Sequence, residues 1–553
     1  MTKTITTFIF LFVWITANSQ QAENSIIVNS KIITDTIDPI WNGVGGSTGL
    51  ALTPQGERLL HRIRKTSDFP FYKRIWGITS TGTAVPFTAE ADWGSTNVYQ
   101  VDKNGNPSYD FTLFDQILDV IIKENFIPIM HLGLMPDSLS SAPDSIPHTK
   151  DNLVKYPPKD YNKWYDLIYH IVKHCSERYG KEKVKKWKWE MWNEPDIINY
   201  WMGTEEDFHK MYDYTAAAVK AALPDTQVGG NSITQSTNRG TPKLIRFIDH
   251  CMNGKNYKDG TTGAPLDFIT FHLKGTNFAI EKLGNFTSQK LAHDAPKFSP
   301  RVAFIKECAE TNLSGIAAIK GTAGIPVYIT EGDIDIGLNV TLAENPAVEY
   351  RNTEYHAVFQ CAFVKQMLDL SAKYSSNPIK NIVFDGTFNP GYRIFEGQRT
   401  LFTAEEIAKP VFNSFKMLGK LGTQRVSLEH SGSNSIDGIA TRMGNKTQVM
   451  IYNFNENVND KASEKVQLTV VLPSSVSYKM KHYRIDENHS NAYTIWKSMG
   501  SPFNPDEAQL KKIKDRQGLE LYEPVKVMNG KINFVVDMPH HSVSLFVFEP
   551  VRD

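Results

Sequence analysis

Two glutamates carry the clearest chemical signal in the sequence. Glu194 belongs to a Trp-Asn-Glu-Pro motif that follows the apolar run 187–192, and Glu331 follows the apolar run 326–330. Two carboxyl groups on either side of one bond are what glycoside hydrolysis requires, because one protonates the leaving oxygen while the other attacks the anomeric carbon. Asn193, beside the first glutamate, can hydrogen-bond the 2-hydroxyl of a sugar. The pair predicts cleavage of a glycosidic bond if the fold brings both glutamates together.

Short apolar runs alternate along the chain with longer segments that have helical spacing. These segments are the elements that could position the two glutamates. Eight apolar runs precede residue 420, namely 41–47, 71–76, 126–132, 187–192, 226–231, 266–272, 326–331 and 381–385. Strands that alternate with helices form a parallel sheet, and eight such units fit an α/β fold, the (β/α)8 TIM barrel. Its fourth and seventh strands would face each other across the mouth. A doubly wound sheet is the alternative, but no glycine-rich phosphate loop opens a helix after the first run.

The character of the sequence changes near residue 422. The remaining segments are short, β-rich and separated by turn residues, which predicts an accessory C-terminal antiparallel β-sandwich. Residues 25–38 also have a strand pattern and could pack against it. The predicted organisation is therefore a signal peptide at 1–19, a strand on the sandwich at 20–40, the catalytic barrel at 41–421 and the sandwich at 422–553.

The first residues have the pattern of an export signal. Lys3 precedes the apolar stretch 7–17, and small residues at 17–19 suit cleavage before Gln20. The stretch is shorter than the roughly 20 residues that span a bilayer, so we expect a periplasmic or secreted protein without a membrane span. A buried N-terminal strand is the alternative. The four cysteines are widely scattered, and their pairing and the oligomeric state are not predictable from sequence.

Composition restricts the partners. Lysine plus arginine and aspartate plus glutamate each total 60, so the basic excess of a nucleic-acid binder is absent. His131, His272 and His356 fall in separate elements without the spacing of a zinc site. We therefore expect a carbohydrate partner, no nucleic acid, no metal and no cofactor.

The sequence resembles glycoside hydrolase family 39, which includes β-xylosidases and α-L-iduronidases, over nearly the whole chain after the signal. Residues 192–196, Trp-Asn-Glu-Pro-Asp, resemble the acid/base motif of the family, and stretches 109–115, 126–136, 157–161 and 350–355 are also similar. The resemblance implies a TIM barrel, an accessory sandwich and a retaining mechanism. It also implies Glu194 as the acid/base and Glu331 as the nucleophile.

Two segments bear on the sugar. His272-Leu273-Lys274-Gly275 resembles the His-Arg-Lys-Gly of the iduronidases, whose lysine contacts the sugar carboxylate. Asp385 and, after it, Gln398-Arg399-Thr400-Leu401 are also similar to an iduronidase pattern whose arginine meets that carboxylate. Lys274 and Arg399 would form a cationic clamp on a C5 carboxylate. The alternative is that Lys274 is a solvated charge and Arg399 a structural ion-pair partner.

Other segments depart from the iduronidase pattern. Leu273 stands in place of the iduronidase arginine, and the motif Arg74-Ile75-Trp76-Gly77 has tryptophan where both subfamilies carry histidine. We nevertheless place Arg74 and Trp76, with Asn193 and His272, among the substrate-binding residues. Residues 332–335 fit neither subfamily, and residues 483–493 look xylosidase-like.

The expected protein is an exported retaining exo-glycosidase that releases a terminal uronic acid, as an α-L-iduronide or β-D-glucuronide, or xylose from a polysaccharide or its oligosaccharides. A β-xylosidase proper is the alternative within this class. A carbohydrate-binding protein without catalysis, or a structural surface protein, is the alternative outside it. Both catalytic carboxylates are present, which favours the enzyme.

Overall fold

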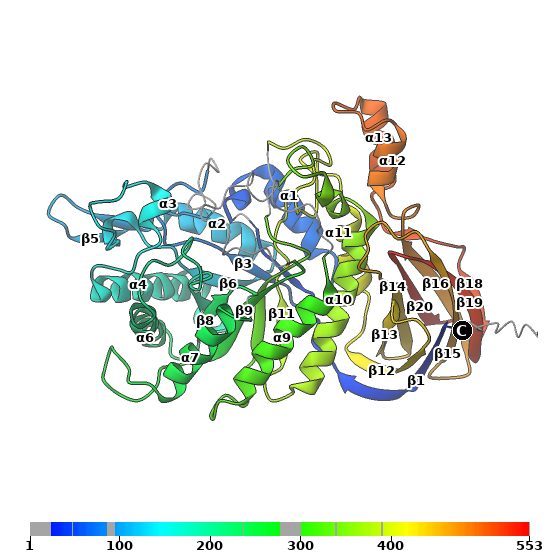
Figure 1. Cartoon of the computed structure of the whole chain (residues 1–553), viewed down its shortest axis with the longest axis horizontal. Coiled ribbons are helices and arrows are strands. Elements are labelled where there is room, and N and C mark those ends of the chain that lie inside the picture. The colour runs from blue at the N-terminus through cyan, green and yellow to red at the C-terminus, as the bar shows by residue number, and fades with distance from the viewer. Residues whose placement is uncertain are drawn as a thin grey trace, which may run out of the picture.

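The computed structural model describes residues 24–46, 48–85, 94–235, 237–276, 300–337, 340–388 and 391–551. The predicted signal peptide lies outside the described residues. Figure 1 shows two parts, a barrel wrapped in helices and a β-sheet domain beside it. Within the described residues, no helix has the length and apolar character needed to cross a membrane.

The barrel confirms the predicted parallel sheet. Its eight strands run in the order β11-β10-β9-β8-β7-β6-β3-β2, and a parallel bridge between Val44 and Phe384 brings the two edges together. The strands are β2 (Gly43–Val44), β3 (Tyr72–Ile75), β6 (Ile127–Leu132), β7 (Lys188–Met191), β8 (Gln227–Ile233), β9 (Phe268–Lys274), β10 (Val327–Asp333) and β11 (Ile379–Ile382). Because both faces of such a sheet are covered, strands such as β9 are buried along their whole length.

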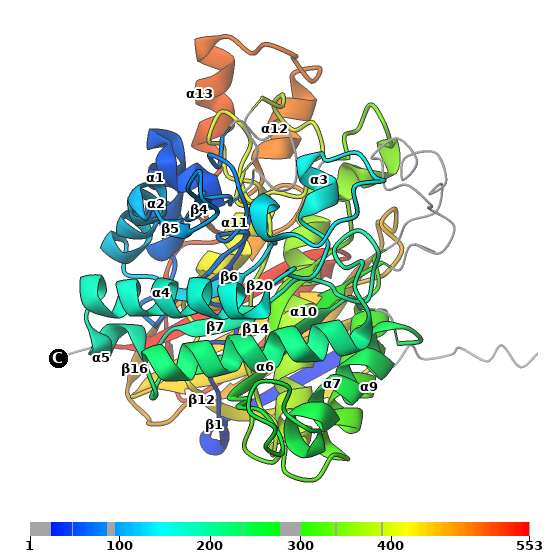
Figure 2. The same cartoon turned by 90° about the vertical axis from the view of Figure 1, so that its left-hand side faces the viewer.

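Helices cover the outside of the barrel. Figure 2 shows α4, α6 and α7 on the side that faces away from the sheet domain. The main helices are α1 (Pro54–Arg64), α2 (Thr112–Lys123), α4 (Tyr161–Tyr179), α6 (Glu205–Ala222), α7 (Gly240–Asn253), α9 (Val302–Ala317), α10 (Glu354–Lys373) and α11 (Pro410–Leu418). Their starts follow from local chemistry: Thr204 forms a capping box with Asp207 at α6, and the Asp160 carboxylate accepts two backbone N–H groups at α4.

Shorter elements fill the connections. They are η1 (Thr48–Leu52), the hairpin of β4 (Tyr99–Val101) and β5 (Pro107–Tyr109), η3 (Asp137–Leu139), α3 (Lys150–Leu153), α5 (Lys181–Val184) and η5 (Pro346–Arg351). All four cysteines are buried and unpaired.

The C-terminal domain is one curled ten-stranded sheet in the order β17-β16-β20-β14-β13-β12-β1-β15-β19, with β18 beside β16. Its strands are β1 (Asn24–Thr36), β12 (Gln424–Ser431), β13 (Ile436–Met443), β14 (Lys446–Asn453), β15 (Ser463–Val471), β16 (Ser477–Ile485), β17 (Glu520–Leu521), β18 (Lys526–Asn529), β19 (Lys531–Pro539) and β20 (Ser542–Pro550). Between β16 and β17, helices α12 (Ala492–Ser498) and α13 (Glu507–Asp515) project from the sheet (Figure 1).

The sheet differs from the expected antiparallel sandwich in one pairing. β1 is a full member of the sheet, antiparallel to β12 but parallel to β15. Strands joined by a tight turn must be antiparallel, whereas β1 arrives from the opposite end of the chain and no hairpin sets its direction. The result is a mixed sheet in which the interior strand β1 precedes the barrel in the chain.

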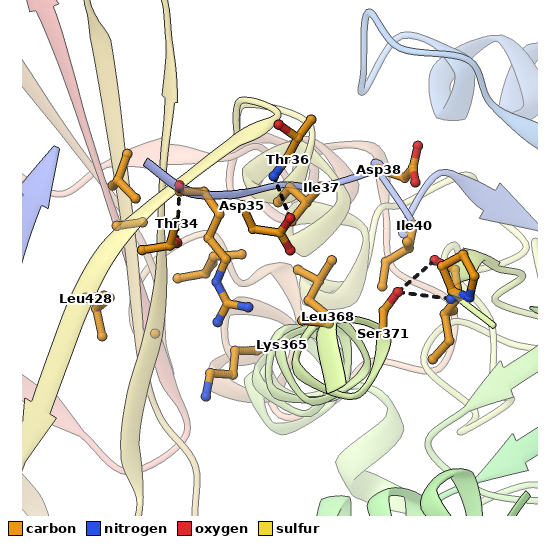
Figure 3. Close-up of a pocket in the computed structure, with 18 of the residues that line it drawn as sticks. Thr34, Asp35, Thr36, Ile37, Asp38, Ile40, Lys365, Leu368, Ser371 and Leu428 are labelled. Atoms are coloured by element: carbon orange, nitrogen blue, oxygen red, sulfur yellow. Dashed lines mark hydrogen bonds between the residues drawn. The ribbon is translucent and has the colours of Figure 1, made fainter. Parts of the chain in front are cut away.

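The two parts share a firm interface built on α10. Apolar side chains of α10 and of β13, β14 and β20 belong to one continuous buried cluster. Ion pairs reinforce the contact, because Lys365 lies 2.6 Å from Asp437 and Arg425 lies 2.6 Å from Asp369. A cavity of about 840 Å³ opens between α10, β1 and β12 (Figure 3), but Pro378 at the amino end of β11 lines it, so it lies away from the strand ends that carry chemistry.

Candidate active site

Both glutamates lie at the carboxyl ends of barrel strands. Glu331 belongs to β10, and Glu194 follows β7. Trp192 and Glu194 have φ values of 66° and 41°, in the left-handed region that such residues rarely adopt. The turn is held by two hydrogen bonds, from Glu194 N–H to the Ser232 carbonyl at 3.0 Å and from the Trp192 indole to the Tyr200 carbonyl at 3.0 Å. The backbone of this turn is therefore strained, and the strained conformation directs Glu194 toward the mouth of the barrel.

The two carboxyl groups lie on either side of a small space. One carboxylate oxygen of Glu194, one of Glu331 and a ring nitrogen of His272 all lie within 4.8 Å of one another. His272 Nδ1 is 2.9 Å from Glu194 Oε1 and 3.7 Å from Glu331 Oε2. Each glutamate side chain remains 14% exposed. The pair is therefore close together and open to a ligand.

Arg74, on β3, connects the acids. Its guanidinium is buried and donates to Glu190 Oε2 at 2.7 Å, to Glu331 Oε1 at 2.7 Å and to Asn193 Oδ1 at 3.0 Å. Because the Asn193 oxygen is occupied by Arg74, its amide N–H groups are the part that can donate to a ligand. One arginine thus orients Glu331 and the residue before Glu194 together.

Lys274 is not a solvated charge. It ends β9, is buried, and its ammonium donates to Glu331 Oε2 at 2.7 Å and to the carboxylate of Asp333. Its positive charge is therefore shared between the predicted nucleophile and a second acid two residues along β10.

Arg399 lies beside the same acids. Its Nη2 is 3.3 Å from Asp333 Oδ2 and 3.6 Å from Asp385 Oδ2, and its Nη1 donates to the Asp335 carbonyl. Arg351, on η5, holds Asp335 with two bonds of 2.7 and 2.8 Å. The structure brings Lys274, Arg399 and Asp385 together as expected, but with Asp333 between the two cations.

Trp76 lies at the end of β3 and stacks on a histidine. Its ring is 5.5 Å from that of His131 with an angle of 3° between their planes. His131 Nδ1 accepts from the Gly77 N–H at 2.9 Å, so its proton is on Nε2. Burial, then Arg74, holds the pKa of His131 well below its usual range, and the stacked pair is an uncharged wall of the mouth.

The surroundings shift the pKa values of two neighbouring carboxyl groups in opposite directions. Burial alone would raise the pKa of Glu331, but His272, Lys274 and Arg74 together hold it well below its usual value. Burial raises the pKa of Asp385, and the negative charges of Glu331 and Asp333 add to the effect. The surroundings thus favour the ionised form of Glu331, which is the form that a nucleophile needs.

In the described part of the chain, two groups of side chains have donor atoms close enough for a metal ion. They are Glu194 with His272 and Glu331, and Glu331 with Asp333 and Asp385. The Lys274 ammonium already bridges Glu331 and Asp333 in the second group. This ammonium supplies the positive charge that a metal would bring there.

Sequence reasoning missed three acids of the site. Glu190 on β7 accepts from Arg74 and from the Ser232 hydroxyl, Asp333 binds Lys274, and Asp335 anchors the arginines. The spacing of these acids could have indicated them, because alternate residues of a strand share one face. Asp333 and Asp335 follow Glu331 at every second position, and Glu190 precedes Glu194 by four residues. We therefore define the mouth cluster as Arg74, Glu190, Glu194, His272, Lys274, Glu331, Asp333, Asp335, Asp385 and Arg399.

Comparison with known proteins agrees with this geometry. A β-xylosidase of Geobacillus stearothermophilus is 26% identical over 520 residues, which cover 93% of each chain. An α-L-iduronidase of Mus musculus is 22% identical over 439 residues, covering 73% of this chain and 63% of the iduronidase. The crystal structure of a monomeric β-xylosidase from Caulobacter crescentus CB15 superposes with a TM-score of 0.77 at 20% identity, over 96% of this chain and 100% of that one.

The family model of "Glycosyl hydrolases family 39" matches residues 91–528, which is most of the chain and includes both glutamates. The barrel and the accessory sheet also agree with the fold of the β-xylosidase from Caulobacter crescentus. The chain belongs to glycosyl hydrolases family 39 and is a glycoside hydrolase.

Proposed function

We propose that this enzyme is a retaining exo-β-xylosidase, which releases terminal xylose from a polysaccharide or its oligosaccharides. One observation carries the choice of sugar: the carboxylate of Asp333 already contacts both members of the expected clamp. Lys274 donates to its carboxylate, and Arg399 lies 3.3 Å from it. A uronic acid would add a further negative charge to this cluster, whereas xylose carries no group at C5 and adds none.

The mechanism begins with Glu331, which is ionised and oriented by Arg74 and Lys274. It attacks the anomeric carbon while Glu194 gives its proton to the glycosidic oxygen, so the bond to the leaving group breaks and a glycosyl ester forms. Glu194, now a carboxylate, takes a proton from water, which attacks the same carbon and frees Glu331. Two inversions leave the configuration unchanged. The short separation of the two carboxyl groups, with oxygens within 4.8 Å, favours this route over a single displacement by water.

Three further side chains bind the sugar or orient the acid/base in this proposal. The Asn193 amide donates to the sugar 2-hydroxyl, because its oxygen is held by Arg74. His272, 2.9 Å from Glu194, fixes the direction of the acid/base carboxyl group. Trp76, stacked on His131, forms an apolar wall for the sugar ring.

A second candidate substrate is a uronide of the α-L-iduronide or β-D-glucuronide type. Lys274 and Arg399 are buried and converge on one side of Glu331, which favours it. Relatives named as α-L-iduronidases point the same way, but they match less well than the β-xylosidases. The one from Mus musculus is only 22% identical, and the one from Homo sapiens is 29% identical over only 35% of this chain. We propose in addition that residues 1–19 direct the protein to the periplasm or the exterior.

The test is a panel of 4-nitrophenyl β-D-xyloside, β-D-glucuronide and α-L-iduronide, with kcat/KM measured for each. We expect the xyloside to be the best substrate, and proton NMR to detect β-xylose as the first product. A preference for either uronide would replace the proposed sugar. Initial formation of α-xylose would refute the retaining mechanism.

A further inference from the structure

A second group of charged residues lies at the opposite end of the barrel. A hollow of about 460 Å³ opens between α1, α11 and β16, and we call it the foot hollow. Four cations and two aromatic rings line it, together with neutral residues and His61: Arg62, Lys65, Phe412, Lys416, Lys420 and Tyr483. No acidic residue is among its described lining.

The foot hollow is remote from the catalytic glutamates. Its cations come from the carboxyl end of α1 and of α11, and α1 leads back to the amino end of β3. The two helix ends touch, because a Cβ on Gly419 would lie 1.9 Å from the Thr66 carbonyl oxygen. The mouth cluster lies at the carboxyl ends of the strands, so the two sites lie at opposite ends of the barrel.

The cations of the foot hollow lack carboxylate partners among the described residues. The Arg62 guanidinium donates to the Glu406 backbone carbonyl at 2.6 Å and to Gln517 Oε1 at 3.2 Å, both neutral. Lys416 donates to Asn413 Oδ1 at 3.1 Å, which is neutral as well.

The acids that border the foot hollow are already engaged. Arg58 binds the Glu406 side chain, and His61 Nδ1 is 2.8 Å from Glu124. Glu549 is held by Lys446 at 3.0 Å and by Lys481 at 2.8 Å. Asp68 and Glu549 act on Lys420, and Glu406 acts on Arg62, only from a distance. The positive charge inside the hollow is therefore only partly compensated.

This arrangement is costly for the protein alone. Burial, then the charges of Arg62 and Lys420, lowers the pKa of Lys416 to about 8. Lysines at the carboxyl end of a helix favour its dipole, but that effect operates within one turn and does not require cations from two helices to face each other. A bound anion would remove both the repulsion and the unpaired charge.

Two rings complete the site. Lys420 lies 5.1 Å from the centre of the half-buried Tyr483 ring, and Lys416 lies 4.9 Å from that of Phe412. Tyr483 can stack on a sugar, with the lysines holding charged oxygens at the sugar's edge. A free inorganic ion would use the lysines but not the ring.

We propose that the foot hollow binds an acidic sugar residue of a polysaccharide, through its sulfate ester or carboxylate, at a distance from the catalytic centre. The proposal requires that the enzyme acts on carbohydrate, as its family does, but not that the terminal sugar is xylose. The hollow then holds an acidic part of a chain while the mouth removes a neutral terminal sugar.

Isothermal titration calorimetry at fixed ionic strength tests the site, with three probes: chondroitin 4-sulfate hexasaccharide, xylohexaose and inorganic sulfate. The proteins compared are the wild type, the double variant Lys416→Met/Lys420→Met, and the control Lys373→Met, which removes an exposed lysine paired with Glu310. We expect the acidic hexasaccharide to lose about 10-fold or more in affinity in the double variant. The wild type and the control should bind it equally, and more tightly than they bind sulfate.

Folding of the double variant is checked through kcat/KM for the aryl xyloside, which should be unchanged because neither lysine touches the mouth. That readout also separates this proposal from the proposed function, since activity can fail while binding at the foot persists. Equal affinity of the wild type and the double variant for the acidic hexasaccharide would overturn the site. Tighter binding of inorganic sulfate than of the hexasaccharide would overturn the sugar as its ligand.

Discussion

The mouth cluster and the foot hollow both contain several cations, but they treat them in opposite ways. At the mouth, Arg74, Lys274 and Arg399 each contact at least one carboxylate of the same chain. At the foot, Arg62 and Lys416 donate only to neutral oxygens. A cluster whose charges are balanced internally suits an uncharged ligand, whereas a cluster with an excess of positive charge favours an anion. The number of cations at a site therefore does not identify its ligand by itself. The carboxylates of the same chain that contact those cations must be counted as well.

The largest effect is expected at the Glu331 carboxylate, which Arg74 and Lys274 both contact. Glu331→Gln keeps the shape of the side chain but removes the nucleophile, so kcat should fall by several orders of magnitude on every aryl glycoside. The matched control is Glu310→Gln on α9, which breaks only the exposed ion pair with Lys373. If Glu331→Gln keeps more than a few per cent of wild-type activity, another group is the nucleophile.

Next in size is the loss of the acid/base. Glu194→Ala should lower kcat/KM by about 10²- to 10⁴-fold on substrates with poor leaving groups, because these need a proton in the transition state. Activated aryl glycosides should be less affected, and added azide should restore their turnover as a glycosyl azide of retained configuration. An equal loss on both kinds of substrate, without rescue by azide, would remove Glu194 from this role.

Asp333→Asn tests directly whether the internal acid decides the sugar. The variant frees Lys274 and Arg399 for a substrate carboxylate, and one charge-assisted contact is worth about 1.5 to 3 kcal/mol. We expect the ratio of uronide to xyloside kcat/KM to rise about 10-fold or more. Asp119→Asn, which alters an exposed pair with Arg178, should leave the ratio unchanged. A ratio that Asp333→Asn does not change would exclude neutralisation as the source of selectivity.

The smallest effect is a shift in pH dependence. The ionised form of Glu331 is favoured in the folded protein, so activity should persist as the pH falls until it passes the lowered pKa. Lys274→Met removes one of the stabilising cations, which raises the pKa of Glu331 and moves the acid limb of kcat/KM to higher pH. Profiles measured with the aryl xyloside check this, with Lys373→Met as the control. An acid limb that stays in place would mean that it reports another group.

Much of the barrel could be predicted from sequence, because its signals are local. Each of the eight apolar runs contains or overlaps a barrel strand. The parallel pairing of β1 with β15 could not be predicted, since the two strands are separated by the whole barrel and no local pattern records their relative direction.

The site divides in the same way. Glu194 and Glu331 follow from a motif and from strand ends, both of which are short-range signals. The capture of Lys274 and Arg399 by Asp333 depends on how β9, β10 and the segment after β11 meet in space. The sequence allows Lys274 and Arg399 to be either a clamp or a surface charge and an ion-pair partner, and burial of Lys274 excludes the surface charge. The spacing of Lys274 and Arg399 in the sequence cannot show that Asp333 lies where the carboxylate of a ligand would bind.

The position of β1 has a consequence for how the molecule is made. This strand is synthesised before the barrel, yet its neighbours β12 and β15 are completed only at Ser431 and Val471. At about 5 to 20 residues per second, the intervening barrel takes on the order of tens of seconds to synthesise. During that interval Ile26 and Val28, buried in the finished sheet, have no partner strand. The length of the barrel therefore sets how long this nascent strand edge stays open to aggregation.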